Sequence, residues 1–439
     1  MRNQDIVKEV ILHIGTGKTG TSHIQDYLYR NRQCLARKHD LDYSRLGLKC
    51  TNHFGEVITA HYPVARWIVK QDEGSLLRLR QGIETSSCSR ILFSCESFYH
   101  ILARKHLEYL KRILQGFRVR VICYVRRQDL YIESAYRQQV KVGQLKAPFS
   151  EFLKTHTDRE QLDQVHANYY KALRRWEEMF SRDAIVVRPF EKTSLYKGDL
   201  LEDFLHLCSL HGALKSCKSQ PNVHNVALPR ELIEVIRYFN STGIVQSHQQ
   251  QSFVEDLMRK MDFADGPMLT YTDRMRIIAN YKDVNKKLFQ RYIGEQEAFD
   301  ESDLDSCKDD SVQAIDINQL LARLVVAAWE ENIFNKHGAI DFVRRGLILA
   351  DCVRNSWVGN GRQSMSKLYL MVRLAFSKNF VPEYYVHKNP DILRSGVNPL
   401  RHYMEHGFDE KRSPSPAIGK EMLRKLSSLY ELLKVRGKA

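Results

Sequence analysis

A glycine-rich segment near the start of the chain combines the residue types that bind phosphate groups. It reads His-Ile-Gly-Thr-Gly-Lys-Thr-Gly-Thr-Ser and ends where a helical pattern begins at about Ser22. Glycines let the backbone curl so that successive N–H groups point at one anion, and the helix N-terminus adds partial positive charge. A lysine supplies a full charge, and hydroxyls supply further donors. The predicted binding residues are Gly15, Thr16, Gly17, Lys18, Thr19, Gly20, Thr21 and Ser22.

The spacing of this loop differs from that of the ATP- and GTP-binding P-loop. That motif needs a glycine five positions before the glycine that precedes its lysine, and the corresponding residue here is Leu12. No Walker-type aspartate strand is evident either. A nucleotide-dependent kinase or NTPase that uses the same loop stays as an alternative interpretation.

A second motif places an arginine and a serine where another anion could bind. The apolar run Val119–Val125 reads as a strand, Arg126 follows directly, and Ser134 lies eight residues later on the next helical segment. A guanidinium at a strand end offers a charge-assisted fork for an oxyanion, and a hydroxyl from the facing helix completes the site.

Together the two motifs resemble the sulfotransferases that use 3′-phosphoadenosine 5′-phosphosulfate (PAPS), in particular the bacterial carbohydrate-type members. Their loop is usually Pro-Lys-Thr-Gly-Thr-[ST], so this chain departs from the pattern at Gly17, where proline is usual. The segments Val187–Glu191 and Lys197–Leu200 look like the family's closing segment, and the resemblance spans roughly residues 6 to 300.

This resemblance implies a reaction and assigns roles to residues. The loop would bind the 5′-phosphosulfate of PAPS, and Arg126 and Ser134 would bind its 3′-phosphate. Lys18 would stabilise the bridging and departing oxygens, no metal would be needed, and the acceptor would be a carbohydrate hydroxyl. A non-catalytic glycan-assembly scaffold that kept the fold is the second alternative, and Gly17 is its best support.

A base is then required to take the proton of the acceptor hydroxyl. His53 lies in a polar stretch after the first helix, and a histidine suits this role near neutral pH. Glu96 follows the strand Arg90–Cys95, at the edge where α/β sheets carry their ligands. His61 is a third and weaker candidate. The sequence favours His53, with Glu96 close behind.

Composition limits the class of protein. The chain has 439 residues, 43% of them hydrophobic and 27% charged, which predicts a globular protein of two or three domains. A net charge of +15 favours an anionic partner, but no nucleic-acid-binding motif is present. Nine cysteines without a Cys-x-x-Cys pair indicate reduced core thiols rather than a disulfide framework.

No signal peptide or membrane span is expected, since the longest apolar candidate, 320–329, is short and contains Arg323. These features predict a cytoplasmic protein that could lie at the inner membrane surface.

Apolar runs at 7–15, 90–95, 119–125 and 184–188 alternate with helical patterns at 107–114, 129–142 and 169–180. This alternation predicts an α/β fold, a parallel sheet flanked by helices. Trp176 is expected to be a core residue of the last of these helices. We predict a sulfotransferase domain over 1–293, an acidic, solvated linker over 294–311, and a helical C-terminal region over 312–439.

Within the C-terminal region, a module at about 378–416 resembles one appended to bacterial glycosyltransferases and polysaccharide-assembly proteins. In those proteins its aromatic residues and histidines are mostly core. This favours a cell-surface glycan as the acceptor and glycan-assembly machinery as a partner. The pair His402 and His406 has the spacing of an inverted zinc-protease motif, but the basic tail that follows offers no convincing third ligand, so we expect no metal site.

Overall fold

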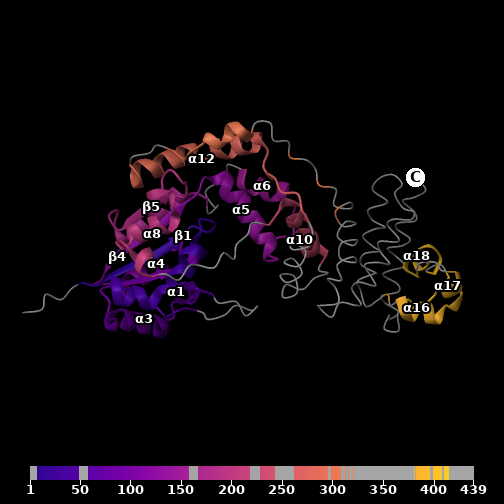
Figure 1. The fold of residues 1–439 in the computed structure, drawn as a ribbon, viewed down its shortest axis with the longest axis horizontal. Coiled ribbons are helices and arrows are strands. Elements are labelled where there is room, and N and C mark those ends of the chain that lie inside the picture. Colours follow the sequence, from indigo (N-terminus) through magenta and orange to yellow (C-terminus); the bar gives the residue numbers. More distant parts are fainter. Residues whose placement is uncertain are drawn as a thin grey trace, which may run out of the picture. The chain divides into compact units, whose positions relative to one another are not determined.

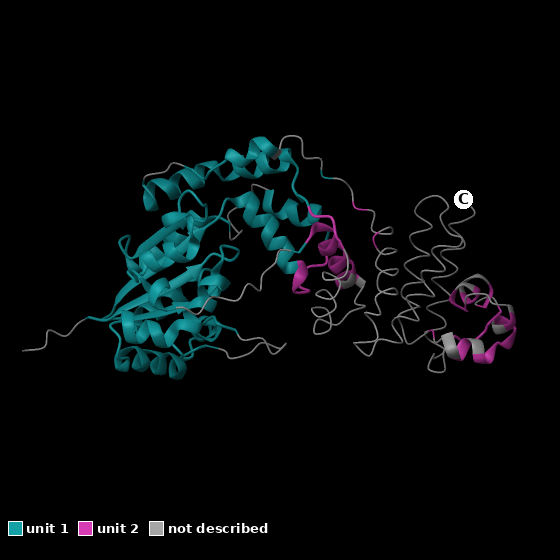
Figure 2. Ribbon diagram, in the orientation of Figure 1, with its two compact units in different colours: residues 1–139, 147–228, 266–312 teal, residues 140–146, 229–265, 313–439 magenta. Residues whose placement is uncertain are grey.

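The computed structural model describes residues 7–48, 58–157, 167–217, 228–242, 262–294, 298–307, 312, 315, 320, 380, 382–395, 399–407 and 410–414. The chain divides into two compact units (Figure 2). Unit 1 comprises 1–139, 147–228 and 266–312, and unit 2 comprises 140–146, 229–265 and 313–439.

Unit 1 is built on a parallel sheet of five strands in the order β2-β3-β1-β4-β5. Figure 1 labels β1, β4 and β5 together with several of the flanking helices. The strands are β1 (Glu9–Gly15), β2 (Leu41–Tyr43), β3 (Arg90–Ser94), β4 (Arg118–Val125) and β5 (Ile185–Pro189). The predicted α/β class and four predicted strands are confirmed. The sequence did not predict β2, because a strand of three residues is too short to give a pattern of its own.

Helices cover both faces of this sheet, as expected for a parallel sheet. Val10, Leu12 and Ile14 of β1 belong to one hydrophobic cluster. The helices that contribute to this cluster are α2 (Tyr62–Lys70), α3 (Glu73–Thr85), α4 (Arg104–Ile113), α7 (Tyr169–Phe180) and α12 (Tyr271–Tyr292). Ile11 belongs to the second cluster, with α1 (Thr21–His39), α8 (Leu200–Leu207) and α9 (Ala213–Ser216). Alternate residues of the central strand therefore hold the two layers of helices.

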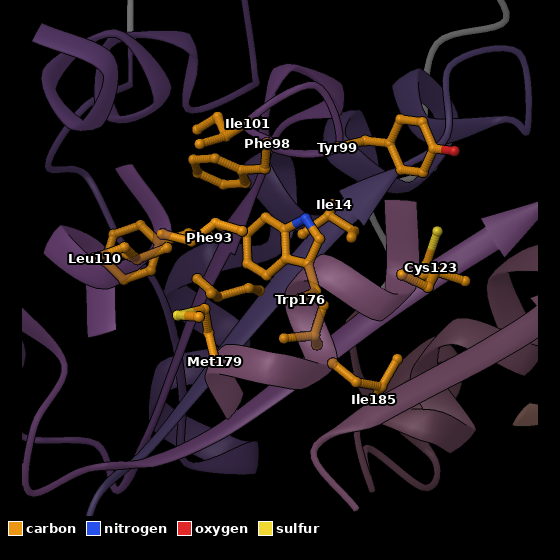
Figure 3. Packing of buried hydrophobic residues seen from close by; sticks show 14 of the residues in the cluster. Ile14, Phe93, Phe98, Tyr99, Ile101, Leu110, Cys123, Trp176, Met179 and Ile185 are labelled. Atoms are coloured by element: carbon orange, nitrogen blue, oxygen red, sulfur yellow. The ribbon is translucent and has the colours of Figure 1, made fainter. Parts of the chain in front are cut away.

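Trp176 is fully buried in the first cluster, as the sequence predicted. Figure 3 shows its indole ring among cluster members that include Ile14, Phe93 and Met179. Unit 1 also contains α6 (Phe149–Thr157), the 3-10 turns η1 (Glu96–Phe98), η2 (Tyr196–Gly198) and η3 (Ser302–Cys307), and most of α5 (Gln128–Lys141). The long helix α12 packs against α6 and α7.

The acidic stretch that we predicted as a solvated linker is partly integrated into unit 1. Phe299 and Leu304 are buried, and Phe299 belongs to the first cluster. Asp303 is paired with Arg127, which is itself buried. Part of this segment is therefore packed into unit 1 by Phe299, Leu304 and the Asp303–Arg127 ion pair, although its acidic composition predicted exposure to solvent.

The prediction that the cysteines are all reduced thiols is wrong for two of them. Cys34 on α1 and Cys217, just after α9, form a disulfide with their Cα atoms 5.8 Å apart. They are 183 residues apart in the sequence, so only the packing of α9 on α1 brings them together. Four other cysteines are buried thiols, as predicted: Cys88, Cys95, Cys123 and Cys208.

Unit 2 contains α10 (Arg230–Thr242) and the short helices α16 (Pro382–Lys388), α17 (Pro390–Ser395), α18 (Pro399–His402) and η5 (Tyr403–Gly407). In the C-terminal module, Tyr385 and Tyr403 are fully buried, so the expected aromatic core is confirmed for these residues. Tyr385 also bonds to His402 at 3.0 Å, and Arg412 joins Asp391. His406, in contrast, is exposed.

Two properties concern only the described part of the chain. None of its helices is long and apolar enough to cross a bilayer, and the candidate run at 320–329 lies outside it except for Leu320. It contains no group of three histidine, cysteine, aspartate or glutamate side chains that could hold a metal ion.

Burial of two histidines predicts a loss of stability in acid. Desolvation lowers the pKa of His13 to about 3 and that of His61 to about 4, against about 6.5 in an unfolded chain. Both pKa values fall on folding, so stability is complete above about pH 6.5 and is lost as the pH falls towards the folded values. Each histidine contributes a slope of about 1.4 kcal/mol per pH unit near pH 5.

We therefore expect His61→Gln to flatten the dependence of the unfolding free energy on pH by about that slope. Urea titrations at several pH values between neutrality and pH 5 measure it. The exposed His23→Gln controls for the substitution itself, and an unchanged slope in His61→Gln would contradict the assignment.

Candidate functional site

The glycine-rich loop joins β1 to α1 and is held in shape by its own threonines. The backbone N–H and the hydroxyl of Thr16 donate to the carbonyl of Tyr124 on β4, at 2.7 and 3.1 Å. The hydroxyl of Thr19 donates to the carbonyl of Thr16 at 2.6 Å. Gly15 and Lys18 both have positive φ angles, 90° and 66°. Two of the hydroxyls predicted to face an anion therefore stabilise the loop itself.

The start of α1 is well suited to bind an anion. Its N-cap is Gly20, which has no side chain to cap the helix, and its first turn carries no acidic residue. The first amides of a helix lack intrahelical acceptors, so those of Thr21 and Ser22 need a partner from elsewhere. Ser22 is also exposed. An anion at this point would satisfy these donors.

Two glycines of the loop are expected to respond differently to alanine. Gly20 has a φ of 74°, and a Cβ there would lie 2.3 Å from Leu200 Cδ2. We expect Gly20→Ala to lower the free energy of unfolding by about 1–3 kcal/mol through strain and overpacking. A Cβ at Gly17 would meet no heavy atom within 4 Å among the described residues.

Gly17→Ala is the matched control, and we expect it to unfold at nearly the wild-type denaturant concentration. Urea titrations of both variants make the comparison. Equal losses of stability would contradict the crowding at Gly20. The space above Gly17 also means that its departure from the usual proline does not reflect close packing.

Arg126 lies on one side of the loop, just beyond the end of β4. Its guanidinium donates to the carbonyl of Lys18 at 3.1 Å and lies over the ring of Phe190, 5.8 Å from its centroid. Desolvation lowers the pKa of Arg126. Within the described ranges, no carboxylate lies at ion-pair distance from it. Arg126 is therefore a half-buried cation that contacts the loop through its hydrogen bond to Lys18 and has no carboxylate partner among the described residues.

The adjacent Arg127, in contrast, has two carboxylate partners. It pairs with Asp129 at 2.8 Å and with Asp303 at 2.5 Å, and it is 3% exposed. Asp129 also binds Arg274 of α12 at 2.9 Å. The first arginine of the tandem thus contacts the loop, whereas the second holds α5, α12 and the acidic segment together.

The helix α5 brings a further residue to the loop that the sequence did not predict. Gln138 accepts a hydrogen bond at 3.2 Å from the ammonium group of Lys18. Ser134, half-buried on the same helix, lies four residues earlier and so on the same helical face. This spacing from Ser134 is the signal that could have indicated Gln138.

Glu96 lies on the other side of the loop, after β3. Its Cα and Cγ would lie 3.3 Å from a Cβ on Gly15, which is a tight contact, and the φ of 90° at Gly15 also favours glycine there. Its carboxylate accepts hydrogen bonds from Thr21 and, at 3.4 Å, from Gln25 on α1. Tyr62, at the start of α2, donates to its Oε2 at 3.2 Å. Glu96 is thus fixed directly against the loop.

A buried chain of hydrogen bonds links Glu96 to Gln25, Ser94 and His13. Gln25 also donates to Ser94 Oγ at 3.1 Å, and Ser94 Oγ lies 2.8 Å from Nδ1 of His13. Because burial holds His13 neutral by lowering its pKa to about 3, Nδ1 can accept the hydroxyl proton of Ser94. Gln25 is therefore left with its amide oriented towards Glu96.

The other two base candidates have different positions. His53 lies outside the described residues. His61 is fully buried, with Nε2 2.8 Å from the carbonyl of Ser44 and Nδ1 accepting from the N–H of Ser94 at 3.0 Å. Both ring nitrogens are therefore occupied by backbone, which makes His61 a structural residue rather than a base.

The segment after β5 closes over the loop. Phe190 donates its N–H to the carbonyl of Val125 at 2.7 Å, and its ring lies near both Arg126 and Gly20. Leu200, the first residue of α8, packs against Gly20. Both segments that the sequence analysis singled out, at 187–191 and 197–200, therefore supply residues to the surroundings of the loop.

Comparisons with known proteins give distant similarities. No family model matches the chain. An uncharacterised protein from Archaeoglobus fulgidus is 26% identical over 214 residues, which are 48% of this chain and 55% of that protein, so the chain spans about half of its relative's length. A crystal structure of a sulfotransferase from Alicyclobacillus acidocaldarius is 15% identical, with a TM-score of 0.32, over 56% of this chain and 95% of that one.

Proposed function

We propose that this protein transfers the sulfuryl group of PAPS to a hydroxyl group of a carbohydrate. The main support is Arg126, a half-buried arginine that contacts the loop through the carbonyl of Lys18 and has no carboxylate partner among the described residues. A desolvated cation of this kind gains most from an anionic ligand with a fixed fork of acceptors, such as a phosphate. The loop and the start of α1 offer a second anion site beside it.

The two sites suit the two ends of one donor. PAPS carries a 5′-phosphosulfate, which would lie on the loop amides and Lys18, and a 3′-phosphate, which would be bound by Arg126 and Ser134. The guanidinium of Arg126 donates to the backbone carbonyl of Lys18, so the two anion sites would be next to one another. When bound, PAPS supplies the sulfuryl group.

We assign the base to Glu96 rather than His53. Its carboxylate lies against Gly15 and accepts from Thr21, at the end of the loop where the sulfuryl group would be held. The acceptor oxygen would form a bond to sulfur and lose its proton to Glu96. The bond from sulfur to the bridging oxygen would break, and that oxygen would leave on 3′-phosphoadenosine 5′-phosphate (PAP). Lys18 would stabilise the negative charge on the bridging and departing oxygens.

The acceptor is proposed to be a growing cell-surface glycan at the inner membrane surface, presented by glycan-assembly machinery. The resemblance of the module at 378–416 supports this, and so does the net charge of +15, which would favour an acidic glycan or an anionic membrane surface.

Calorimetric titration of the full chain tests the donor, with PAP and with ATP, each with and without Mg²⁺. We expect PAP to bind more tightly than ATP and to need no metal. Tighter binding of ATP, with dependence on Mg²⁺, would overturn the proposal in favour of a kinase or NTPase. Absence of PAP binding would instead support a non-catalytic scaffold.

A further inference from the structure

Tyr62 combines an exposed aromatic side chain with a hydrogen bond to the proposed base. It is 41% exposed, although it is the first residue of a helix whose other face is buried in the core. Its hydroxyl donates to Oε2 of Glu96 at 3.2 Å. Burial of this hydroxyl next to Glu96 raises the pKa of Tyr62, so the phenol remains a proton donor. The residue therefore presents part of its ring to solvent and its hydroxyl to Glu96.

The position of Tyr62 is set rigidly by the residue before it. His61 is the N-cap of α2, and its N–H donates to the carbonyl of Ser94 at 2.9 Å. The imidazole ring of His61 bonds to the backbone of Ser94 through Nδ1 and to that of Ser44 through Nε2. These bonds fix the first turn of α2 to the ends of β2 and β3. A solvated side chain with a fixed backbone can bind a ligand at a low cost in entropy.

The neighbourhood of Tyr62 differs from that of the donor residues. Arg126, Gln138 and Phe190 lie on the side of the loop towards β4 and β5. Tyr62 and Glu96 lie on the side towards β3. The carboxylate of Glu96 accepts from Tyr62 through one oxygen and from Thr21 of the loop through the other, so it lies between them. A molecule bonded to Oε2 of Glu96 would therefore lie next to Tyr62.

From this arrangement we propose that Tyr62 is a specificity residue that binds the sugar ring of the acceptor and delivers its hydroxyl to Glu96. The inference rests on the proposed function, and it adds a recognition residue to it. The C–H face of a pyranose would pack on the exposed phenol ring, as apolar surfaces do on aromatic side chains. The acceptor hydroxyl would replace the phenol hydroxyl at Oε2 of Glu96, donating in its place.

This exchange has a consequence for selectivity. The exchange keeps the number of hydrogen bonds to Glu96 constant, so it does not favour binding by itself. Binding is favourable only for an acceptor that also packs on the ring of Tyr62. Acyclic polyols have hydroxyls but no flat C–H face. We therefore expect cyclic sugars to bind and a straight-chain polyol such as glucitol to bind poorly.

Saturation-transfer NMR on the full chain saturated with PAP tests this proposal. The probes are the methyl glycosides of glucose, galactose, mannose and N-acetylglucosamine, with glucitol as the acyclic comparison. We expect at least one glycoside to give a signal with wild type, Tyr62→Phe to keep it, and Tyr62→Ala to lose most of it. The Phe variant is the matched control, because it keeps the ring and removes only the bond to Glu96.

The outcomes separate this proposal from the proposed function. If PAP binds but no glycoside does, or if Tyr62→Ala binds glycosides as well as wild type, the role of Tyr62 is wrong and the donor assignment stands. If glucitol matches the glycosides, ring packing is wrong. If PAP itself does not bind, the proposed function fails. PAP affinity measured on Tyr62→Ala shows whether that variant has kept its loop.

Discussion

Lys18→Met is expected to lower the rate of sulfuryl transfer about a thousand-fold, which corresponds to about 4 kcal/mol of transition-state stabilisation. In the proposed reaction, negative charge accumulates on the bridging and departing oxygens, and we assign its stabilisation to Lys18. Its ammonium group donates to Gln138, a neutral side chain, at 3.2 Å. The measurement is the initial rate of PAP formation from PAPS in the presence of the methyl glycosides.

The fold should be unaffected by this change, since Lys18 is only partly buried. We therefore expect Lys18→Met to melt near the wild-type temperature. Lys38→Met, which replaces an exposed lysine in the last turn of α1, is the control for charge and should retain the wild-type rate. A rate within a few-fold of wild type for Lys18→Met, in a folded protein, would exclude a catalytic role for this lysine.

Arg126→Ala is expected to weaken the binding of PAP about a hundred-fold, which is roughly 2.7 kcal/mol. The affinity for adenosine 5′-phosphate should change little, because that ligand lacks the 3′-phosphate. The reason is the state of the arginine: it is desolvated, and its hydrogen bond to a described residue goes to the carbonyl of Lys18. Calorimetric titration with both ligands gives the ratio directly.

Two further variants make this result specific. Arg126→Lys keeps the charge but loses the fork, so we expect an intermediate loss for PAP. Arg30→Ala removes a surface arginine that pairs with Asp26 on α1, and should leave both affinities unchanged. Equal losses for PAP and adenosine 5′-phosphate in Arg126→Ala would mean that the arginine supports the loop rather than a 3′-phosphate.

The sequence predicted the central strands and the loop, because their signals are local. A buried strand, a run of glycines and the start of a helix are read from about twenty consecutive residues around Gly15. The same holds for β4 and Arg126, which follow one another directly. The short strand β2 and the packing of the acidic segment through Phe299 were missed, since neither has a local pattern that differs from a loop.

The residues around the proposed base could not be predicted in the same way. Glu96 was one of three candidates, and the sequence placed His53 ahead of it. Its contact with Thr21 joins residues that are 75 positions apart, and its bond with Tyr62 joins residues 34 apart. The first contact exists because β3 pairs with β1, so that the ends of the two strands meet at one edge of the sheet. The second exists because His61, the N-cap of α2, is hydrogen-bonded to Ser94 at the end of β3.

By itself, then, the sequence determined an α/β chain with a glycine-rich loop after its first strand and an arginine at the end of the neighbouring strand. The tertiary structure decided how that loop is completed. It placed Glu96, Tyr62 and Gln138 around the loop, turned the hydroxyls of Thr16 and Thr19 inward, and joined Cys34 to Cys217. The physical reason is that backbone curvature and charge are properties of neighbouring residues, whereas a partner for a side chain depends on which strands and helices pack together.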